Sequence, residues 1–234
     1  MAPTASTVDC VTWVPMPSKV DIAFKLAHRH DLALDFHVDE GLDIEADGFA
    51  EIVAATKRAR MAGRVLCGHG CSLSVHADER LSRTLADGAE AGIALVVLPT
   101  TNLYLQDRIG GRSPRRRGVA PVLEARKAGV EVMLGVDNCR DAFYPFGDYD
   151  PLAILRLAVL ACHVDPEDWL DSITTLPAMH CGLPVTPIAV GEPADFIWFD
   201  AADLRDLVSR PGAERIVYRQ GRRLGQNRQR RRPA

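Results

Sequence analysis

Four residues with side chains suited to metal-assisted hydrolysis lie at the ends of apolar, strand-like runs of this sequence. His37, His69 and Asp137 each end such a run, and Glu40 follows His37 by three positions. Histidine and aspartate side chains are ligands for hydrolytic metal ions such as zinc or iron(II). A carboxylate beside such an ion can accept a proton from water and later pass it to a leaving group. The pattern therefore predicts a hydrolytic metal site.

The elements that must position these residues alternate along the chain. Strands are predicted at 7–14, 32–37, 64–68, 93–98 and 130–137, and helices at 19–30, 48–61, 77–91, 121–128 and 151–162. A polar, Arg-rich loop is predicted from Thr100 to Gly118. This alternation indicates βα units and a parallel sheet, and the nearly continuous apolar strands fit a sheet covered on both faces. Since a β/α barrel keeps its chemistry at the C-terminal ends of its strands, the predicted site residues should share one face.

The number of predicted units sets the fold class. A complete (β/α)8 TIM-type barrel needs about 250 residues. This chain has 234, and its residues after 187 are predicted to lie outside the barrel. We expect an α/β fold, a TIM-type barrel of a metal-dependent hydrolase that lacks its first strands. Residues 1–187 would form this partial barrel, and 188–222 a small β-sandwich-type segment with strands at 195–199 and 215–218. The basic tail 223–234 is predicted to be disordered.

Composition limits the classes of function. Apolar residues make up 47% of the chain and the net charge is −3, so we expect a buried core and no nucleic-acid partner. The most apolar segment, 151–162, is too short to cross a membrane, and the N-terminus lacks a signal-peptide pattern. The six cysteines form no C-x-x-C pair, which favours reduced cysteines and a cytoplasmic location.

Several short motifs occur together in one order. They are His37-Val-Asp-Glu40, Gly68-His69, the segment 99–108, Arg115-Arg-Arg-Gly118, and Gly135-Val-Asp-Asn138 followed by Tyr144-Pro145. In this combination the sequence resembles the cytosine deaminase-like branch of the amidohydrolase superfamily, over about residues 8–224. The resemblance implies a metal-bearing β/α barrel with a small β-sandwich. It also implies hydrolysis of a non-peptide C–N bond that deaminates an aminated pyrimidine or related heterocycle.

The resemblance also implies roles for the four residues. His37, His69 and Asp137 match the ligands of one divalent metal ion, zinc or iron. Asp137 matches the aspartate that also accepts a proton from the bound water. Glu40 matches the acid that carries a proton to the ring nitrogen of the substrate. The implied partner is thus a small heterocyclic substrate.

Two further residues match positions that line the substrate pocket of the family, Asn138 and Phe143. Cytosine-selective members carry a second acid directly after the metal-binding aspartate, where this chain has Asn138. An amide both donates and accepts hydrogen bonds, so the substrate preference changes. A related aminated ring or an N-substituted heterocycle therefore fits as well as cytosine. The unrelated cytidine-type zinc deaminases are excluded, because their H-x-E and P-C-x-x-C motifs are absent.

One departure keeps other readings open. The family has a His-x-His pair after its first strand, and upstream of His37 only His28-Arg-His30 has this spacing, at the end of a predicted helix. The alternative to an enzyme is an inactive remnant that serves as a binding or structural protein. A third reading is an enzyme that is active only when another chain supplies the early strands. Homo-oligomer formation is also left open by the sequence.

Overall fold

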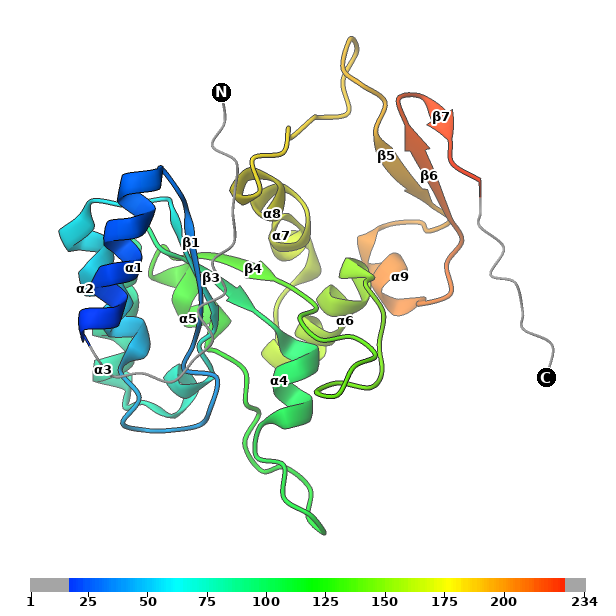
Figure 1. Ribbon diagram of the computed structural model, residues 1–234. Coiled ribbons are helices and arrows are strands. Elements are labelled where there is room, and N and C mark those ends of the chain that lie inside the picture. The colour runs from blue at the N-terminus through cyan, green and yellow to red at the C-terminus, as the bar shows by residue number, and fades with distance from the viewer. Residues whose placement is uncertain (1–16, 226–234) are drawn as a thin grey trace. The chain divides into compact units, whose positions relative to one another are not determined.

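The computed structural model describes residues 17–225 (Figure 1). The predicted strand at 7–14 and the tail from 226 to 234 lie outside these residues. The chain divides into two compact units between Leu183 and Pro184. The boundaries expected at residues 187 and 222 remain predictions.

The first unit is built on a parallel sheet. Its strands are β1 (Leu34–Val38), β2 (Val65–His69), β3 (Ala94–Val97) and β4 (Glu131–Leu134). They pair in the order β1-β2-β3-β4, and every pair is parallel. Four predicted strands are therefore confirmed, together with the α/β class. In this order each strand lies beside its neighbours in sequence, which brings the C-terminal ends of all four to one edge of the sheet.

Helices connect the strands. They are α1 (Pro17–His30), α2 (Gly48–Ala59), α3 (Asp78–Ala91), α4 (Pro99–Leu105), α5 (Val122–Lys127), α6 (Pro151–Cys162), α7 (Pro166–Trp169) and α8 (Thr175–His180), with short 3-10 helices at Cys71–Val75 and Leu170–Ile173. Helix α2 packs between α1 and α3, as Figure 1 shows. No helix in the described part of the chain is long and apolar enough to cross a membrane.

One of these helices corrects the sequence prediction. The segment from Thr100 to Gly118 was expected to be a loop, but its first residues belong to α4. Pro99 occupies the first turn of this helix, where its fixed φ and missing N–H cost nothing. The polar residues that follow it have low intrinsic helix propensity, which is why their sequence favoured a loop. Burial of Thr101 and Asn102 shows that tertiary packing outweighs this propensity.

The core lies between the sheet and its helices. In β1 the side chains of Leu34, Phe36 and Val38 are buried, whereas Asp35 and His37 lie on the opposite, less covered face. This alternation follows from the two-residue period of a strand. On the helix side, Phe49 of α2 is completely buried. Each such buried apolar side chain contributes roughly 1.5–3 kcal/mol relative to an exposed one.

The second unit contains a small antiparallel sheet. Its strands are β5 (Phe196–Phe199), β6 (Arg215–Arg219) and β7 (Arg222–Arg223), and helix α9 (Leu204–Ser209) lies between β5 and β6 in the chain. The predicted strands at 195–199 and 215–218 are confirmed as the β5–β6 pair. Stacking of the Phe196 and Tyr218 rings, with centroids 4.8 Å apart, supports this pairing.

Candidate active site

The predicted site residues come from the C-terminal edge of the parallel sheet. His37 lies near the end of β1, His69 is the last residue of β2, and Asp137 follows β4 by three residues. His69 is only 1% exposed, whereas Asp137 is half-buried. The backbone is left-handed at both His69, with φ of 71°, and Asp137, with φ of 62°. Such conformations are uncommon for residues other than glycine and cluster at functional sites.

The two histidines lie ring to ring. The centroids of the His37 and His69 rings are 5.1 Å apart, and the planes meet at 63°. Their proximity follows from the pairing of β1 with β2, because His37 is in register with Gly68, directly before His69. Gly68 has no side chain to separate the two rings. The structure thus brings two of the three predicted metal ligands together.

Glu40 lies close to the same histidine pair. Its Oε1 atom is 3.9 Å from Nδ1 of His69. The turn that carries Glu40 is held by backbone bonds, in which the N–H of Gly70 donates to Val38 and that of Ser72 donates to Asp39. These bonds join the end of β1 to the segment that follows β2. They therefore fix the predicted proton-transferring carboxylate beside His69.

The side chain of Asp39 anchors the other end of this turn. Its two carboxylate oxygens accept the N–H groups of Gly48 and Phe49, at 3.2 and 2.9 Å, where helix α2 begins. A Cβ atom at position 48 would lie 2.7 Å from an oxygen of Asp39, so only glycine allows this approach. Burial raises the pKa of the Asp39 carboxyl, although the two N–H donors oppose the shift.

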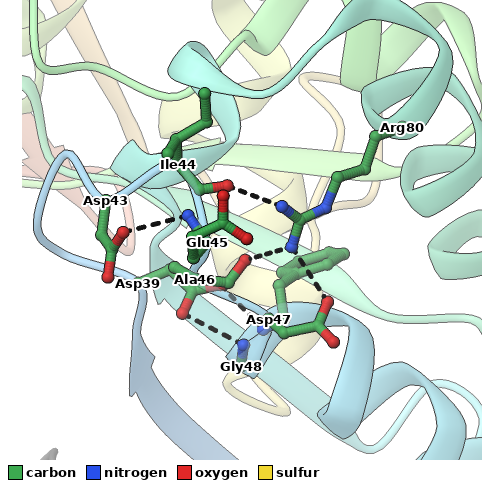
Figure 2. A network of polar contacts seen from close by, with 9 residues as sticks. Asp39, Asp43, Ile44, Glu45, Ala46, Asp47, Gly48 and Arg80 are labelled. Atoms are coloured by element: carbon green, nitrogen blue, oxygen red, sulfur yellow. Dashed lines mark hydrogen bonds and ion pairs between the residues drawn. The ribbon is translucent and has the colours of Figure 1, made fainter.

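Arg80 of α3 fastens the loop between β1 and α2 (Figure 2). Its guanidinium donates to the carbonyl oxygens of Ile44 and Ala46, each at 2.6 Å, and to the Asp47 carboxylate at 3.1 Å. Asp43 adds a turn within the loop by accepting the N–H of residue 45. Because the planar guanidinium holds several donors in a fixed fork, a single side chain sets the course of this loop.

Burial also determines the charge state of His69. Loss of water contact lowers the pKa of its imidazole, and the carboxylates of Glu40 and Asp137 oppose this shift. Asp137 therefore lies near enough to act on His69 electrostatically. The lowered pKa favours the neutral imidazole at neutral pH, and a neutral imidazole keeps one ring nitrogen with a free lone pair.

The strand end that bears Asp137 is fastened to α4. Thr100 and Thr101 donate their hydroxyl protons to the carbonyl oxygen of Val136, at 2.8 and 3.4 Å. The N–H of Asn138 in turn donates to the Thr101 hydroxyl at 3.2 Å. Helix α4, which the sequence prediction missed, therefore sets the backbone on both sides of Asp137.

The two residues predicted to line the substrate pocket lie in the loop after β4. The side-chain amide of Asn138 donates to Asp141 at 2.6 Å, and Phe143 is 62% exposed. Three other aromatic side chains of the region are in mutual edge-to-face contact. Tyr104 contacts both Tyr144 and Phe146, and Tyr144 contacts Phe146. Their scattered positions in the sequence gave no signal of this contact. The lining roles of Asn138 and Phe143 stay predictions.

The histidine pair fits part of a metal site. Nε2 of His69 is buried and has no hydrogen-bond partner. A neutral imidazole nitrogen in this state is a suitable donor for a zinc or iron ion. Across residues 17–225, however, no group of three or more His, Cys, Asp or Glu side chains is arranged to hold a metal ion. His37 and His69 are gathered, whereas coordination by Asp137 stays a prediction.

A cavity lies elsewhere in the first unit. It has a volume of about 870 Å³. Its lining comes from the loops after β1 and β2, the start of α3, the segment that leads into α5 and the end of α6, and includes Ile44, His76, Leu81, Arg117, Pro121 and Leu123. None of the six predicted site residues lines it. The candidate site is therefore defined by the convergence of its side chains at the sheet edge.

A comparison with protein families identifies the group to which this fold and site belong. The model of the Amidohydrolase family matches residues 3–224, nearly the whole chain. The chain belongs to the amidohydrolase family. The resemblance inferred from the sequence motifs is thus confirmed.

Individual relatives of this amidohydrolase chain are named as deaminases or related hydrolases. A pterin deaminase of Rhizobium rhizogenes (strain K84 / ATCC BAA-868) is 41% identical over 208 residues, which are 88% of this chain and 48% of that protein. Two crystal structures, each 28% identical, superimpose closely. A 5-methylcytosine deaminase from Klebsiella pneumoniae does so with a TM-score of 0.80, over 90% of this chain and 52% of its own. An N-isopropylammelide isopropylaminohydrolase from Burkholderia multivorans superimposes with a TM-score of 0.73, over 88% of this chain and 51% of its own.

The extent of these matches matters for the site. The chain spans about half the length of the relatives it matches. The fold shared with them is the α/β arrangement of the parallel sheet with its helices. His37, Glu40, His69 and Asp137 all lie within the matched segment.

Proposed function

We propose that this chain carries the catalytic edge of a hydrolytic deaminase that acts on an amino-substituted heterocyclic ring. The observation that carries the proposal is the meeting of three side chains at one sheet edge. The rings of His37 and His69 are in contact, and Glu40 lies 3.9 Å from Nδ1 of His69. Two imidazoles and a neighbouring carboxylate in a partly buried site are a typical set for metal-assisted hydrolysis. The relatives named above support the same reaction class.

Each residue has a proposed role. His37 and His69 would hold a divalent metal ion, zinc or iron, together with Asp137, and such an ion lowers the pKa of a water molecule. Asp137, which follows β4 at the same edge of the sheet, would accept a proton from the attacking water. Glu40 would bind the ring nitrogen next to the reacting carbon and deliver a proton to it.

The proposed reaction balances in a simple way. Water adds its oxygen to the ring carbon that carries the amino group. One of its protons reaches the neighbouring ring nitrogen through Glu40, and the other reaches the amino group through Asp137. The C–N bond then breaks, the amino group leaves as ammonia after taking up a proton, and the ring carbon becomes a carbonyl. Glu40 is suited to this transfer because it lies on a short turn fixed at both ends. A carboxylate held in this way stays at a constant distance from the reacting atoms during both proton transfers.

The proposed substrate class follows from the loop after β4. Asn138 stands where cytosine-selective relatives place a second acid, and its amide donates to Asp141. An amide facing a substrate presents both a donor and an acceptor, unlike a carboxylate. We therefore propose an aminated pyrimidine or a larger heterocycle that contains such a ring. The exposed Phe143 would supply an aromatic face for stacking.

The proposed architecture is a TIM-type barrel of which this chain forms the later strands. The sheet ends in β1 on one side and β4 on the other, and in the described chain neither has a second partner strand. The matched segment covers about half of each relative, which agrees with a site completed by further strands. An inactive remnant receives no comparable support, since the relatives reported above are named for deamination or hydrolysis.

The function can be tested on the intact chain. Metal content is measured on the purified protein, and ammonia release is measured with a panel of aminated pyrimidines, pteridines and triazines. We expect close to one zinc or iron per chain, and turnover that Asp137→Ala lowers by at least about 100-fold. Asp148→Ala, which removes an exposed carboxylate from the same loop, serves as the matched control. Absence of both metal and turnover would contradict an enzymatic role for this chain alone.

A further inference from the structure

Asn102 and His69 form a buried pair to which the resemblance assigns no joint role. Asn102 comes from α4 and is completely buried, and its Nδ2 atom lies 2.9 Å from Nδ1 of His69. Each partner has a second polar atom that is buried without a hydrogen bond. These atoms are Oδ1 of Asn102 and Nε2 of His69. Unpaired buried polar atoms are uncommon, so two of them in one pair require an explanation.

The pair allows two arrangements that differ in the position of one ring proton. With the amide nitrogen of Asn102 toward His69, Nδ1 accepts and the proton of the neutral imidazole is on Nε2. Rotation of the amide by half a turn brings Oδ1 to Nδ1, which then carries the proton and donates it. The amide has nearly the same shape in both orientations, so packing does not choose between them.

Glu40 favours the second arrangement. Its Oε1 atom lies 3.9 Å from the same Nδ1 atom of His69. A lone pair on Nδ1 would face this carboxylate, whereas an N–H group there is attracted to it. In either arrangement one buried polar atom of each partner stays unpaired, Nε2 of His69 and the amide atom of Asn102 that faces away from the ring. The contact with Glu40 therefore distinguishes the two.

We propose that Asn102 is a positioning residue, whose amide oxygen accepts the Nδ1 proton of His69 and so keeps the lone pair on Nε2. This lone pair is then available to an electron-poor ligand such as a divalent metal ion. Histidines that bind metals usually donate their other ring N–H to a fixed acceptor, which orients the ring. The ligand-binding consequence rests on the proposed function, whereas the position of the proton does not.

The proton position can be measured by NMR on the metal-free, full-length chain with 15N-labelled histidine. The signals of His69 are assigned through their loss in His69→Gln. We expect the wild-type chain to show the proton on Nδ1. Asn102→Asp keeps an oxygen acceptor and removes the donor, so it should retain the Nδ1 proton. Asn102→Leu removes the acceptor and should raise the share of the Nε2–H form, although Glu40 still opposes this change. A wild-type proton on Nε2, or loss of the Nδ1 proton in Asn102→Asp, would overturn the proposal.

A neighbouring residue supplies the matched control. Thr101 lies beside Asn102 on α4 and is also completely buried, but its hydroxyl donates to Val136. Thr101→Val should therefore leave the His69 proton on Nδ1. If it moved the proton as Asn102→Leu does, the effect would come from a general change in α4, and the positioning role of Asn102 would be rejected. Asn102→Asp is nearly isosteric, so it keeps the test decisive even where the leucine variant does not fold.

Zinc affinity gives a second measurement. Competition with a chelator should show zinc binding weakened about 10–100-fold by Asn102→Leu, since loss of a histidine's fixed partner typically has this effect. Asn102→Asp should bind zinc at least as well as that leucine variant. Equal affinities of wild type and Asn102→Leu would refute the consequence for metal binding. A wild-type chain that binds no zinc would instead count against the proposed function, and the NMR result would still decide the proton position.

Discussion

The two sides of the candidate site are built in different ways. On the β1–β2 side, Arg80 holds the loop near Glu40 through bonds that span 34 and 36 residues of sequence. On the β4 side, Asp141 organises the loop through bonds to residues only two or three positions away, Phe143 and Tyr144. Glu40 is thus held beside a loop that a distant part of the fold fixes, whereas Phe143, which is proposed to meet the substrate, lies in a loop that is fixed locally.

Exposure follows the same division. His69 is almost fully buried, whereas Phe143, Phe146 and Tyr149 are exposed by 62%, 61% and 75%. Long-range anchoring favours a precise geometry, which proton transfer needs. Locally held loops tolerate substitution and carry differences in specificity. The comparison teaches that a change at Glu40 or in the loop beside it should impair chemistry, as should a change at Asp137. A change in the loop beyond Asn138 should instead alter the choice of substrate.

Among the variants that test this comparison, Glu40→Gln should have the largest effect on turnover. The variant keeps the size of the side chain but removes its ability to exchange a proton, so kcat should fall by about 10²–10⁴-fold. Ammonia release at saturating substrate measures the change. Glu45→Gln, on the exposed part of the same loop, is the control and should keep wild-type turnover. Similar kcat values for Glu40→Gln and the wild type would remove Glu40 from the chemistry.

A smaller effect is expected from Arg80→Met, which removes the clamp and keeps the length of the side chain. The lost bonds to two carbonyl oxygens and Asp47 should lower the free energy of unfolding by about 1–2 kcal/mol, because the side chain is partly exposed. Turnover should fall with little change in KM. Urea unfolding and steady-state kinetics measure the two quantities.

Arg83→Met is the matched control for this clamp. Arg83 lies one turn further along α3, is exposed, and donates to the carbonyl oxygen of Glu79 in its own helix. Its replacement should change the unfolding free energy by less than about 0.5 kcal/mol. Equal effects of the two substitutions would show that the loop does not depend on Arg80.

The smallest effect is expected on the β4 side, from Phe143→Ala. Because the ring is mostly exposed, the free energy of unfolding should change by less than about 0.5 kcal/mol. KM should rise several-fold and kcat should change little, as expected for a group that binds substrate and transition state equally. Tyr149→Ala removes an even more exposed ring from the same loop and is the control. A large fall in kcat would contradict the division between the two sides.

Much of the fold could be predicted because its signals are local. Apolar runs marked β1 to β4, and the residues that end them placed His37, His69 and Asp137 at one edge of a parallel sheet. The periodic apolar pattern at 151–162 likewise gave the bounds of α6. These features depend on residues that are close in sequence, so a single chain shows them.

The features that were missed depend on contacts between distant segments. Nothing near Arg80 indicates that it binds a loop 34 residues earlier. Helix α4 forms although its first turn is polar, because Thr101 finds a partner just after β4 and Asn102 finds one on β2. The motif containing Asn102 was visible in the sequence, but its role required the position of His69. Tertiary packing supplies information that propensity and spacing do not contain.

The Arg80 clamp has a consequence for how the protein folds. The loop it fastens precedes α2, whereas Arg80 belongs to α3, which packs on the far side of α2. The loop therefore reaches its final course only after α3 has formed and docked. Its amide hydrogens should exchange with solvent at rates that follow the opening of α3, and mutations in it should change the unfolding rate more than the folding rate. We therefore expect the segment beside Glu40 to be among the last parts of this unit to become ordered.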